Sequence, residues 1–256
     1  MPARVLSVDI GNTNVHIGLV DCDNVACRGS DVFPTSLLKR RLCASLASLV
    51  PRGIAAEALP IVICSVVNID RAEVSGALTT FGMALPRWFE YSPVFPMSVA
   101  YDDPYTLGVD RLADCLYSQA ACPGQSRIII DAGTATKVDY FANGNEFTGG
   151  VILSGIATQL KSLHDHTSAL PLVKPSESAI EFPGTSTESA MTAGATYGTA
   201  GALSFLVDRY RQKYGDVPVL ATGGAWKQVE SLVTFEFEYV KDMTLLGTGL
   251  FERVAK

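Results

Sequence analysis

Charged side chains are scarce in this sequence. Only 18% of its 256 residues are Asp, Glu, Lys or Arg, whereas 48% are hydrophobic. This balance excludes an intrinsically disordered chain and predicts a well-buried core. Positive charge is also in deficit, because 20 Lys and Arg stand against 26 Asp and Glu, a net charge of −6. Binding of nucleic acid regardless of sequence, or of an anionic membrane, requires a basic surface, so we expect neither partner.

Long hydrophobic runs and cysteine motifs are missing as well. The first apolar stretch is short and is interrupted by Asp9, which is unlike a signal peptide. The longest uncharged stretch, residues 189–207, carries three Gly and three Thr and is typical of a closely packed helix rather than a membrane span. The six cysteines form no Cys-x-x-Cys pair and fit no zinc pattern. We therefore expect free thiols in a reducing compartment and a cytoplasmic location.

Several familiar catalytic and binding motifs do not occur. There is no Gly-x-x-x-x-Gly-Lys-[Ser/Thr], Gly-x-Gly-x-x-Gly, His-Glu-x-x-His or Gly-x-Ser-x-Gly segment. Gly247-Thr248-Gly249 follows no predicted strand and lacks a third glycine. His164 and His166 lack a third ligand nearby, which favours a solvated loop over a metal site.

One strand-and-turn pattern occurs twice. An apolar strand at residues 4–9 leads into Asp9-Ile10-Gly11-Asn12, and another at 127–130 leads into Asp131-Ala132-Gly133-Thr134, 122 positions later. Each is followed by two more short strands and then by helical segments. Chance remains an alternative, because Asp-x-Gly is a common turn, but the matching strands favour duplication. We predict an α/β protein with lobes at residues 1–124 and 125–256, divided at Pro123-Gly124.

The other elements follow from hydrophobic periodicity and from turn residues. Helices are expected at 34–50, from an N-cap at Asn68 to 81, at 111–121, at 188–214, between 224 and 235, and at 246–256. Further strands are expected at 15–20, 25–28, 60–67, 136–141, 147–153, 217–221 and 235–240, with a loop of Pro and Ser residues at 171–183 that includes Ser178.

The predicted helix at 188–214 carries a stripe of small residues. Ala190, Gly194, Gly198 and Ala202 recur every four positions, which lets another helix approach closely. That partner is either part of the same chain or a second subunit, and the sequence does not distinguish the two.

The two Asp-x-Gly turns are the first candidate site. A strand that ends in Asp places a carboxylate at the sheet edge, and the following Gly lets backbone N–H groups turn toward a ligand. An adjacent Asn or Thr adds a side-chain donor, so the combination suits phosphate oxygens and a divalent cation. Either turn alone is compatible with an ordinary hairpin. Together they indicate two loops that hold one nucleoside triphosphate.

A second candidate is Gly108-Val109-Asp110-Arg111, where an irregular loop meets a predicted helix. Asp110 could be a helix cap and Arg111 a surface residue. Alternatively, Asp110 accepts the proton of an attacking hydroxyl, as aspartates do in phosphoryl transfer, and Arg111 binds a carboxylate or phosphate.

Taken together, five segments resemble the type III pantothenate kinase family of the acetate and sugar kinase/Hsp70/actin superfamily. They occur in the family's order: Asp9-Ile10-Gly11-Asn12-Thr13; Gly108-Val109-Asp110-Arg111 with Tyr101 and Pro104 upstream; Asp131-Ala132-Gly133-Thr134-Ala135-Thr136; Gly149-Gly150; and Thr222-Gly223-Gly224. The resemblance implies two duplicated ribonuclease H-like (actin-like ATPase) domains. Each has a mixed sheet with a three-stranded meander flanked by helices.

The resemblance also implies a role for particular residues. The first ATP-phosphate loop comprises Asp9, Ile10, Gly11, Asn12, Thr13, Asn14, Val15 and His16, with Asp9 near Mg²⁺. The pantothenate pocket comprises Tyr101, Gly108, Val109, Asp110, Arg111 and Thr187, with Asp110 as proton acceptor. Thr134 contacts ATP, and Asp131 binds a monovalent cation, K⁺ or NH₄⁺. The family is typically homodimeric.

Three positions depart from the family pattern. Lys137 stands where Thr is usual, Ser154 where Pro is usual, and His166 where Arg is common. Strand alternation places Lys137 opposite Thr136, which favours an outward-facing lysine. A second hypothesis is that the Lys137 ammonium replaces the monovalent cation near Asp131.

The resulting prediction is ATP-dependent phosphorylation of pantothenate, the first step of coenzyme A synthesis. Pantothenate itself rests on the resemblance, because the residues alone indicate only phosphate chemistry with a hydroxyl acceptor. The alternatives are another small-molecule kinase or a phosphatase of the superfamily, or a non-catalytic regulator that retains the fold.

Overall fold

The computed structural model describes residues 4–176 and 180–254. These residues form two compact units. The first unit comprises the chain up to Gln125, residues 142–148 and the segment from Asp242 onward. The second unit comprises Ser126–Phe141 and Gly149–Lys241.

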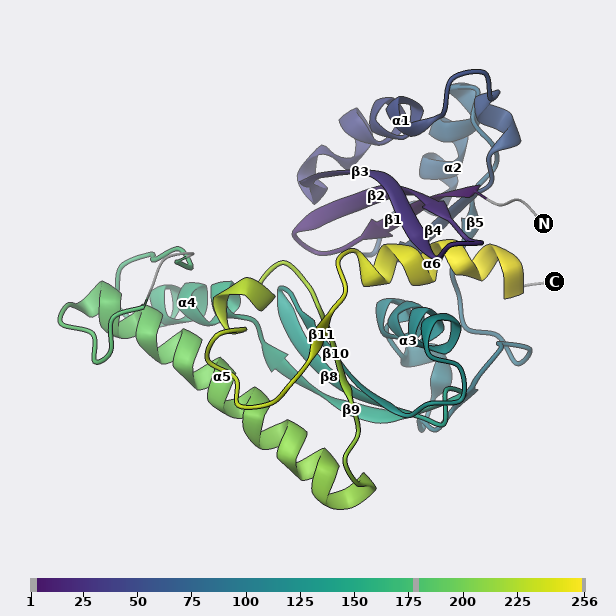
Figure 1. Cartoon of the computed structure of the whole chain (residues 1–256). Helices are drawn as coiled ribbons and strands as arrows, with labels where there is room; N and C mark the ends of the chain where they lie inside the picture. The colour runs from purple at the N-terminus through teal and green to yellow at the C-terminus, as the bar shows by residue number, and fades with distance from the viewer. Residues whose placement is uncertain (1–3, 177–179, 255–256) are drawn as a thin grey trace. The chain divides into compact units, whose positions relative to one another are not determined.

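The first unit is built on a five-stranded sheet of order β3-β2-β1-β4-β5 (Figure 1). Its strands are β1 (Arg4–Ile10), β2 (Asn14–Asp21), β3 (Ala26–Pro34), β4 (Ile61–Ser65) and β5 (Arg87–Trp88). The first three strands form an antiparallel meander, whereas β4 pairs in parallel with β1 and β5 in parallel with β4. The carboxyl ends of β1 and β4 therefore lie side by side, the arrangement that presents ligand sites in α/β sheets.

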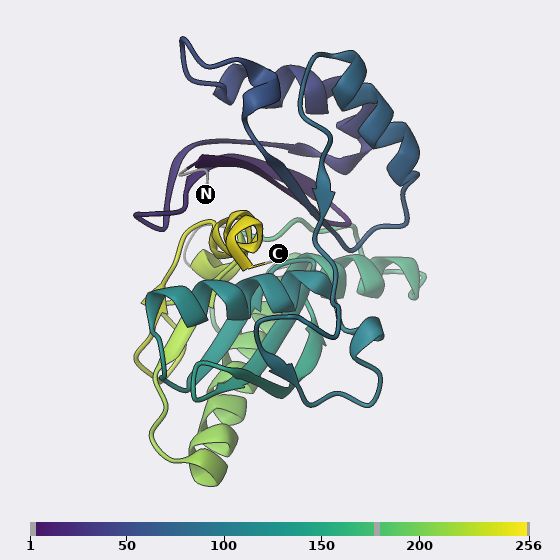
Figure 2. The ribbon, with the colours of Figure 1, turned by 90° about the vertical axis from the view of Figure 1, so that its right-hand side faces the viewer.

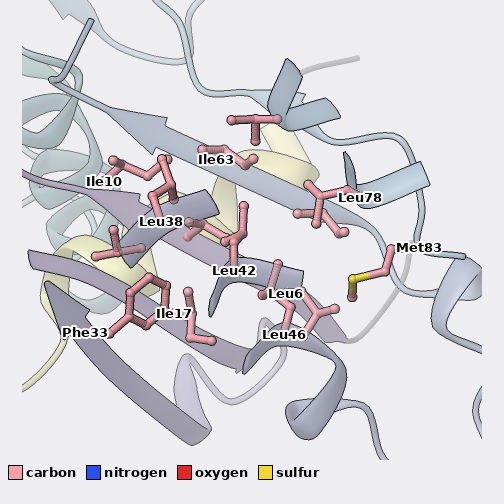
Figure 3. Close-up of a cluster of buried hydrophobic side chains, with 14 of the residues drawn as sticks. Leu6, Ile10, Ile17, Phe33, Leu38, Leu42, Leu46, Ile63, Leu78 and Met83 are labelled. Carbon is pink, nitrogen blue, oxygen red and sulfur yellow. The ribbon is translucent and has the colours of Figure 1, made fainter. Parts of the chain in front are cut away.

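Helices α1 (Leu38–Leu49) and α2 (Arg71–Thr80) cover one face of this sheet. Leu38, Leu42 and Leu46 of α1 face the sheet because they recur at helical spacing. Figure 3 shows these side chains against Ile17 and Phe33 of the meander in a cluster of buried hydrophobic residues. Burial of this cluster fixes α1 against the strands that carry the first Asp-x-Gly loop.

Two further helices complete the first unit: α3 (Val109–Ala121) and α6 (Met243–Val254). They lie side by side in Figures 1 and 2, and α6 also contacts β1. Ser7 of β1 donates a hydrogen bond to the Leu245 carbonyl at 2.7 Å, and Thr244 donates to the Asp114 carboxylate at 2.8 Å. The C-terminal helix thus joins the first sheet to α3.

The second sheet has the order β11-β10-β7-β8-β9-β6. Its strands are β7 (Arg127–Ala132), β8 (Ala135–Ala142), β9 (Glu146–Ser154), β10 (Val219–Thr222), β11 (Glu238–Tyr239) and β6 (Ser98–Val99). Strands β7 and β8 are antiparallel, and β10 pairs in parallel with β7. Helices α4 (Ile156–Asp165) and α5 (Thr187–Tyr214) belong to the second unit and contact each other.

Most predicted elements are present, with differences at their ends. Helix α1 begins at Leu38 rather than at 34, because β3 continues to Pro34 in register with β2. Asp70, not Asn68, is the N-cap of α2, and its carboxylate accepts the N–H groups of Ala72 and Glu73. The helix expected between 224 and 235 is only a short 3₁₀ segment, Trp226–Gln228.

The lobes at 1–124 and 125–256 are predicted from the repeated sequence pattern, and this division stays a prediction. The compact units differ from them because α6 belongs with the first sheet. Within the described ranges, no helix is long and apolar enough to cross a membrane. Ser178 and the expected helical residues 255–256 lie outside the described residues.

Candidate active site

The turn between β1 and β2 is the first Asp-x-Gly loop. The strands pair up to Ile10 and Val15, and the Gly11 N–H donates to the Asn14 carbonyl at 3.0 Å. Thr35 braces the loop from outside, because its hydroxyl donates to the Gly11 carbonyl at 2.7 Å. Asn12 and Thr13 are exposed at the tip of this braced loop. The loop therefore presents polar groups from a fixed backbone.

The turn between β7 and β8 is the second Asp-x-Gly loop, and it is one residue shorter than the first. The Gly133 N–H donates to the Ala135 carbonyl at 3.1 Å. The Thr158 hydroxyl of α4 donates to the Thr134 carbonyl at 2.7 Å, one position later in the motif than the Gly11 carbonyl that Thr35 engages. Gly155 fits only because it lacks a side chain, since a Cβ there would lie 2.0 Å from the Gly133 carbonyl oxygen. A threonine hydroxyl therefore holds each of the two Asp-x-Gly loops, at neighbouring positions of the motif.

Asp110 lies in the first turn of α3. The N-cap of this helix is Gly108, so the alternative of Asp110 as the cap is wrong. The Asp110 Oδ1 accepts a hydrogen bond from the backbone N–H of Arg111 at 2.9 Å. A Cβ at Gly108 would lie 2.6 Å from that same oxygen, so glycine leaves room for the carboxylate. Gly108 thereby permits this orientation of Asp110.

Arg111 is not a surface residue, because only 4% of it is exposed. Its guanidinium lies over the ring of Phe147 at 5.0 Å and over the ring of Tyr101 at 5.9 Å. Stacking on aromatic rings fixes the plane of the guanidinium and hence the direction of its donors. A guanidinium held in this way can bind a carboxylate or phosphate through two parallel hydrogen bonds.

Asp9 and Asp110 both raise the pKa of the Cys64 thiol. Cys64 is opposite Asp9 in the register of β1 and β4. Burial raises the pKa of the Cys64 thiol well above its usual value, and the negative charges of Asp9 and Asp110 raise that pKa further. Asp9 and Cys64 are neighbours in the parallel pairing of β1 and β4, and α3, which carries Asp110 in its first turn, packs against β4. This brings the predicted ATP loop and the predicted proton acceptor together within the first unit.

In the second unit, Asp131 forms an ion pair with Lys137. The Lys137 Nζ lies 2.5 Å from Asp131 Oδ2, and the two side chains are only 13% and 15% exposed. The expectation of an outward-facing lysine is therefore wrong, although Thr136 does alternate to the buried face. A monovalent cation about 4 Å from this ammonium would meet a repulsion of about 4 kcal/mol at an effective dielectric constant of about 20. The donor set at Asp131 does not fit an additional cation well.

The remaining residues of the second unit lie at the end of β10 and at the start of α5. Thr222 of β10 is opposite Asp131 in the sheet register, and Gly223 follows with a positive φ of 95°. A Cβ at Gly223 would lie 2.3 Å from the Ala132 carbonyl oxygen. Thr187 is the first residue of α5 and is exposed, directly after the N-cap Ser186.

The predicted site residues thus divide between the two units. Asp9, the loop after it, Tyr101 and the segment Gly108–Arg111 belong to the first unit, whereas Asp131, Thr134 and Thr187 belong to the second. Sequence reasoning missed Phe147, which reaches Arg111 from β9, and the bracing hydroxyls of Thr35 and Thr158. No local signal marks these residues, since each contact joins distant parts of the chain.

Comparison with known proteins identifies relatives over most of the chain. The sequence model described as type III pantothenate kinase matches residues 5–209. A type III pantothenate kinase of Dehalococcoides mccartyi is 31% identical over 242 residues, which cover 88% of this chain and 87% of the relative. One from Porphyromonas gingivalis is 30% identical over 236 residues, covering 90% and 94%.

Solved structures show the same fold at low sequence identity. Component A of (R)-2-hydroxyglutaryl-CoA dehydratase from Acidaminococcus fermentans aligns over 100% of both chains with a TM-score of 0.55 and 14% identity. A ROK family glucokinase from Streptomyces griseus, solved with glucose and AMPPNP, aligns over 96% of this chain and 98% of its own with a TM-score of 0.53 and 12% identity. The predicted actin-like fold of two mixed α/β domains is confirmed. Because the family model spans most of the chain and two relatives reach 30% identity over nearly all of it, the chain belongs to the type III pantothenate kinase family.

Proposed function

We propose that this protein transfers the γ-phosphoryl group of ATP to the primary hydroxyl of pantothenate, forming 4′-phosphopantothenate in the first step of coenzyme A synthesis. The observation that carries the proposal is that Asp110 and Arg111 begin a helix, α3, that packs against β4, the strand paired with β1 at Asp9, within one compact unit. Family membership supports the activity and the substrate.

In this proposal, each of the two Asp-x-Gly loops is assigned to ATP. The backbone of the first loop and the side chains of Asn12 and Thr13 contact the phosphates, together with the flanking residues Asp9, Ile10, Gly11, Asn14, Val15 and His16. Thr134 of the second loop is assigned to ATP as well. Phosphoryl transfer depends mainly on positioning and charge neutralisation, which rigid loops provide without reorganisation.

Asp110 orients the pantothenate hydroxyl and accepts its proton as the oxygen attacks the γ-phosphorus. The backbone N–H of Arg111 already engages Oδ1, which limits rotation of the carboxylate. The leaving group is ADP. Arg111 binds the carboxylate of pantothenate, and Tyr101, Gly108, Val109 and Thr187 are the further residues assigned to this substrate.

Magnesium is the expected partner of the ATP phosphates, and Asp9 is the residue that would hold it. Within the described residues, no group of three or more His, Cys, Asp or Glu forms a metal cage. A single carboxylate fits this ion, because Mg²⁺ usually takes one or two carboxylates together with substrate phosphates and water. When bound, Mg²⁺ supplies charge neutralisation to the β- and γ-phosphates.

At Asp131, where the family resemblance implies a monovalent cation, Lys137 already engages the carboxylate. The homodimer is also part of the proposal. It is supported by the small residues of α5, because Gly194 and Gly198 are exposed and nothing described lies within 4 Å of a Cβ built on either.

The test is a coupled assay of ADP release with pantothenate, applied to the wild type and to Asp110→Asn. We expect kcat to fall by about 10²-fold or more in the variant, the usual contribution of a general base. The affinity for ATP, measured by calorimetry with a non-hydrolysable analogue, should stay within about twofold, because Asp110 is assigned to the acceptor alone.

Asp102→Asn is the matched control, since Asp102 is exposed in the preceding loop and has no assigned role. Its kcat should equal that of the wild type. Unchanged turnover in Asp110→Asn would refute the assigned role. A panel of other hydroxyl acceptors tests the substrate: turnover of a different acceptor in preference to pantothenate contradicts the proposal, as does absence of ADP release with all of them.

A further inference from the structure

We propose that the ammonium group of Lys137 is a built-in replacement for the monovalent cation at Asp131, so that this enzyme works without K⁺ or NH₄⁺. The inference rests on the proposed function, because the charge at Asp131 serves the loop assigned to ATP. It departs from the family expectation and assigns Lys137 a positioning role.

The sheet register fixes this ion pair. Asp131 and Lys137 are directly opposite each other in the antiparallel pair of β7 and β8. Opposite residues of such a pair carry their side chains on the same face, with Cβ atoms about 5 Å apart. A lysine at this position therefore reaches the carboxylate with little freedom to move elsewhere. The separation of 2.5 Å between Nζ and Oδ2 reflects that constraint.

The pair is also sheltered from water. Both side chains are less than one-sixth exposed, unlike the pair of Lys161 and Asp165 on α4, whose side chains are 65% and 42% exposed. Solvent and salt screen a sheltered pair far less than an exposed one. The attraction between Lys137 and Asp131 is therefore weakened little by water and salt.

The position of the pair connects it to nucleotide binding. Asp131 ends the apolar part of β7 immediately before the loop of Gly133 and Thr134, and Thr222 lies opposite it on β10. The carboxyl ends of parallel strands are where α/β sheets bind ligands. A positive charge at this edge offsets the Asp131 carboxylate, which would otherwise repel a polyanion approaching the loop.

The first copy of the repeat has a related arrangement. Asp9 is opposite His16 in β1 and β2, as Asp131 is opposite Lys137 in β7 and β8. Each copy therefore carries a nitrogen base across from its aspartate. Only in the second is that base a lysine, which the structure pairs with the aspartate at 2.5 Å.

The ammonium group of Lys137 has the properties needed to replace the cation and also to exclude it. A lysine ammonium carries the same charge as K⁺ or NH₄⁺ and donates hydrogen bonds as NH₄⁺ does. Because it is tethered, it does not have to be recruited from solution. It also occupies Oδ2 and repels a second cation, so one group excludes the other.

The first experiment compares kcat/KM in KCl, NH₄Cl and tetramethylammonium chloride at constant ionic strength. Wild type should change by less than about twofold, well under 1 kcal/mol. Lys137→Thr restores the residue usual in the family. It should lose activity by about tenfold or more in tetramethylammonium and recover with K⁺ or NH₄⁺. Lys161→Thr, which removes the exposed ion pair, should behave as the wild type in every salt.

The second experiment measures cation binding without turnover, from the unfolding temperature as K⁺ replaces tetramethylammonium. A saturable rise is expected for Lys137→Thr alone, because a ligand that binds only the folded state stabilises it. A saturable rise in the wild type, or activation of the wild type by K⁺ of more than twofold, overturns the inference. So does a Lys137→Thr variant that folds but shows no response to K⁺.

If Lys137→Thr fails to fold, the wild-type titrations decide the matter alone. If no salt supports turnover of pantothenate, the proposed function fails, while the unfolding measurement still reports on the cation site.

Discussion

Arg111 shows how the setting of one residue defines its chemistry. The guanidinium is nearly buried and stacked on Phe147 and Tyr101, and it follows directly after Asp110 on α3. A lysine would keep the charge but lose the planar fork and the stacking. The arrangement favours recognition of a planar anion, which the carboxylate of pantothenate provides.

We therefore expect Arg111→Lys to raise the KM for pantothenate by about tenfold or more, the effect of losing one charge-assisted hydrogen bond. The KM for ATP should stay within about twofold, because Arg111 is assigned to the acceptor. Steady-state kinetics with each substrate varied in turn measures both. Arg71→Lys is the matched control, since Arg71 also stacks on an aromatic ring, Trp88, but is exposed. An equal change in both KM values for Arg111→Lys would contradict the assignment.

At the scale of elements, the contact of α6 with α3 positions Asp110 and Arg111. Gly247 makes this contact possible, because a Cβ there would lie 1.7 Å from the Ala113 carbonyl oxygen. Gly249 is similarly close to β2, where its Cβ would lie 2.8 Å from Val20 Cβ. The segment Gly247-Thr248-Gly249 is therefore a helix-packing device, in agreement with the rejection of a nucleotide loop there.

Gly247→Ala should destabilise the protein by about 1–3 kcal/mol, the usual cost of overpacking, because backbone rather than a flexible side chain must move. Displacement of α3 should also lower kcat/KM at temperatures where the variant remains folded. Urea unfolding followed by circular dichroism measures the first effect, and the ADP-release assay measures the second.

Gly76→Ala in α2 is the matched control, since nothing described lies within 4 Å of a Cβ there. It should stabilise the protein by about 0.5–1 kcal/mol, because alanine is the better helix former. A Gly247→Ala variant as stable as the wild type would show that α6 and α3 do not pack this closely in solution.

At the scale of the whole molecule, α5 carries a stripe of exposed small residues. Its buried residues include Thr196, Ala200, Leu203 and Val207, whereas Gly194, Gly198 and Gly201 are exposed. Phe205 is 64% exposed on the same helix. Small residues beside an exposed aromatic ring suit close contact with another helix, which supports the proposed homodimer as the partner of this stripe.

Gly198→Arg should convert the proposed dimer into a monomer, because a long charged side chain blocks close approach of a second helix. Light scattering after gel filtration measures the mass, with 27.3 kDa expected for one chain of the natural sequence. Gly76→Arg is the control, since that glycine is equally open but lies on α2. A dimeric Gly198→Arg protein would exclude this stripe from the interface, and a monomeric wild type would refute the dimer.

Local signals were sufficient to predict the strands and the two braced turns. Alternating and continuous apolar residues define β1, β2, β7 and β8, and Asp-x-Gly marks the turns that join them. Local signals also marked the segment Gly108–Arg111 as a candidate functional site. Errors arose where distant pairing overrides local preference, as at the end of β3, whose pairing with β2 delays the start of α1.

By itself, the sequence determined the duplicated strand-and-turn pattern, the candidate Asp and Arg residues and the family, because these depend on the order and spacing of neighbouring residues. Only the tertiary structure decided that Lys137 pairs with Asp131, that Phe147 supports Arg111 and that the C-terminal helix belongs with the first sheet. The physical reason is that such contacts depend on strand register and on helix packing between segments far apart in the chain, where no short pattern records which partner will be met.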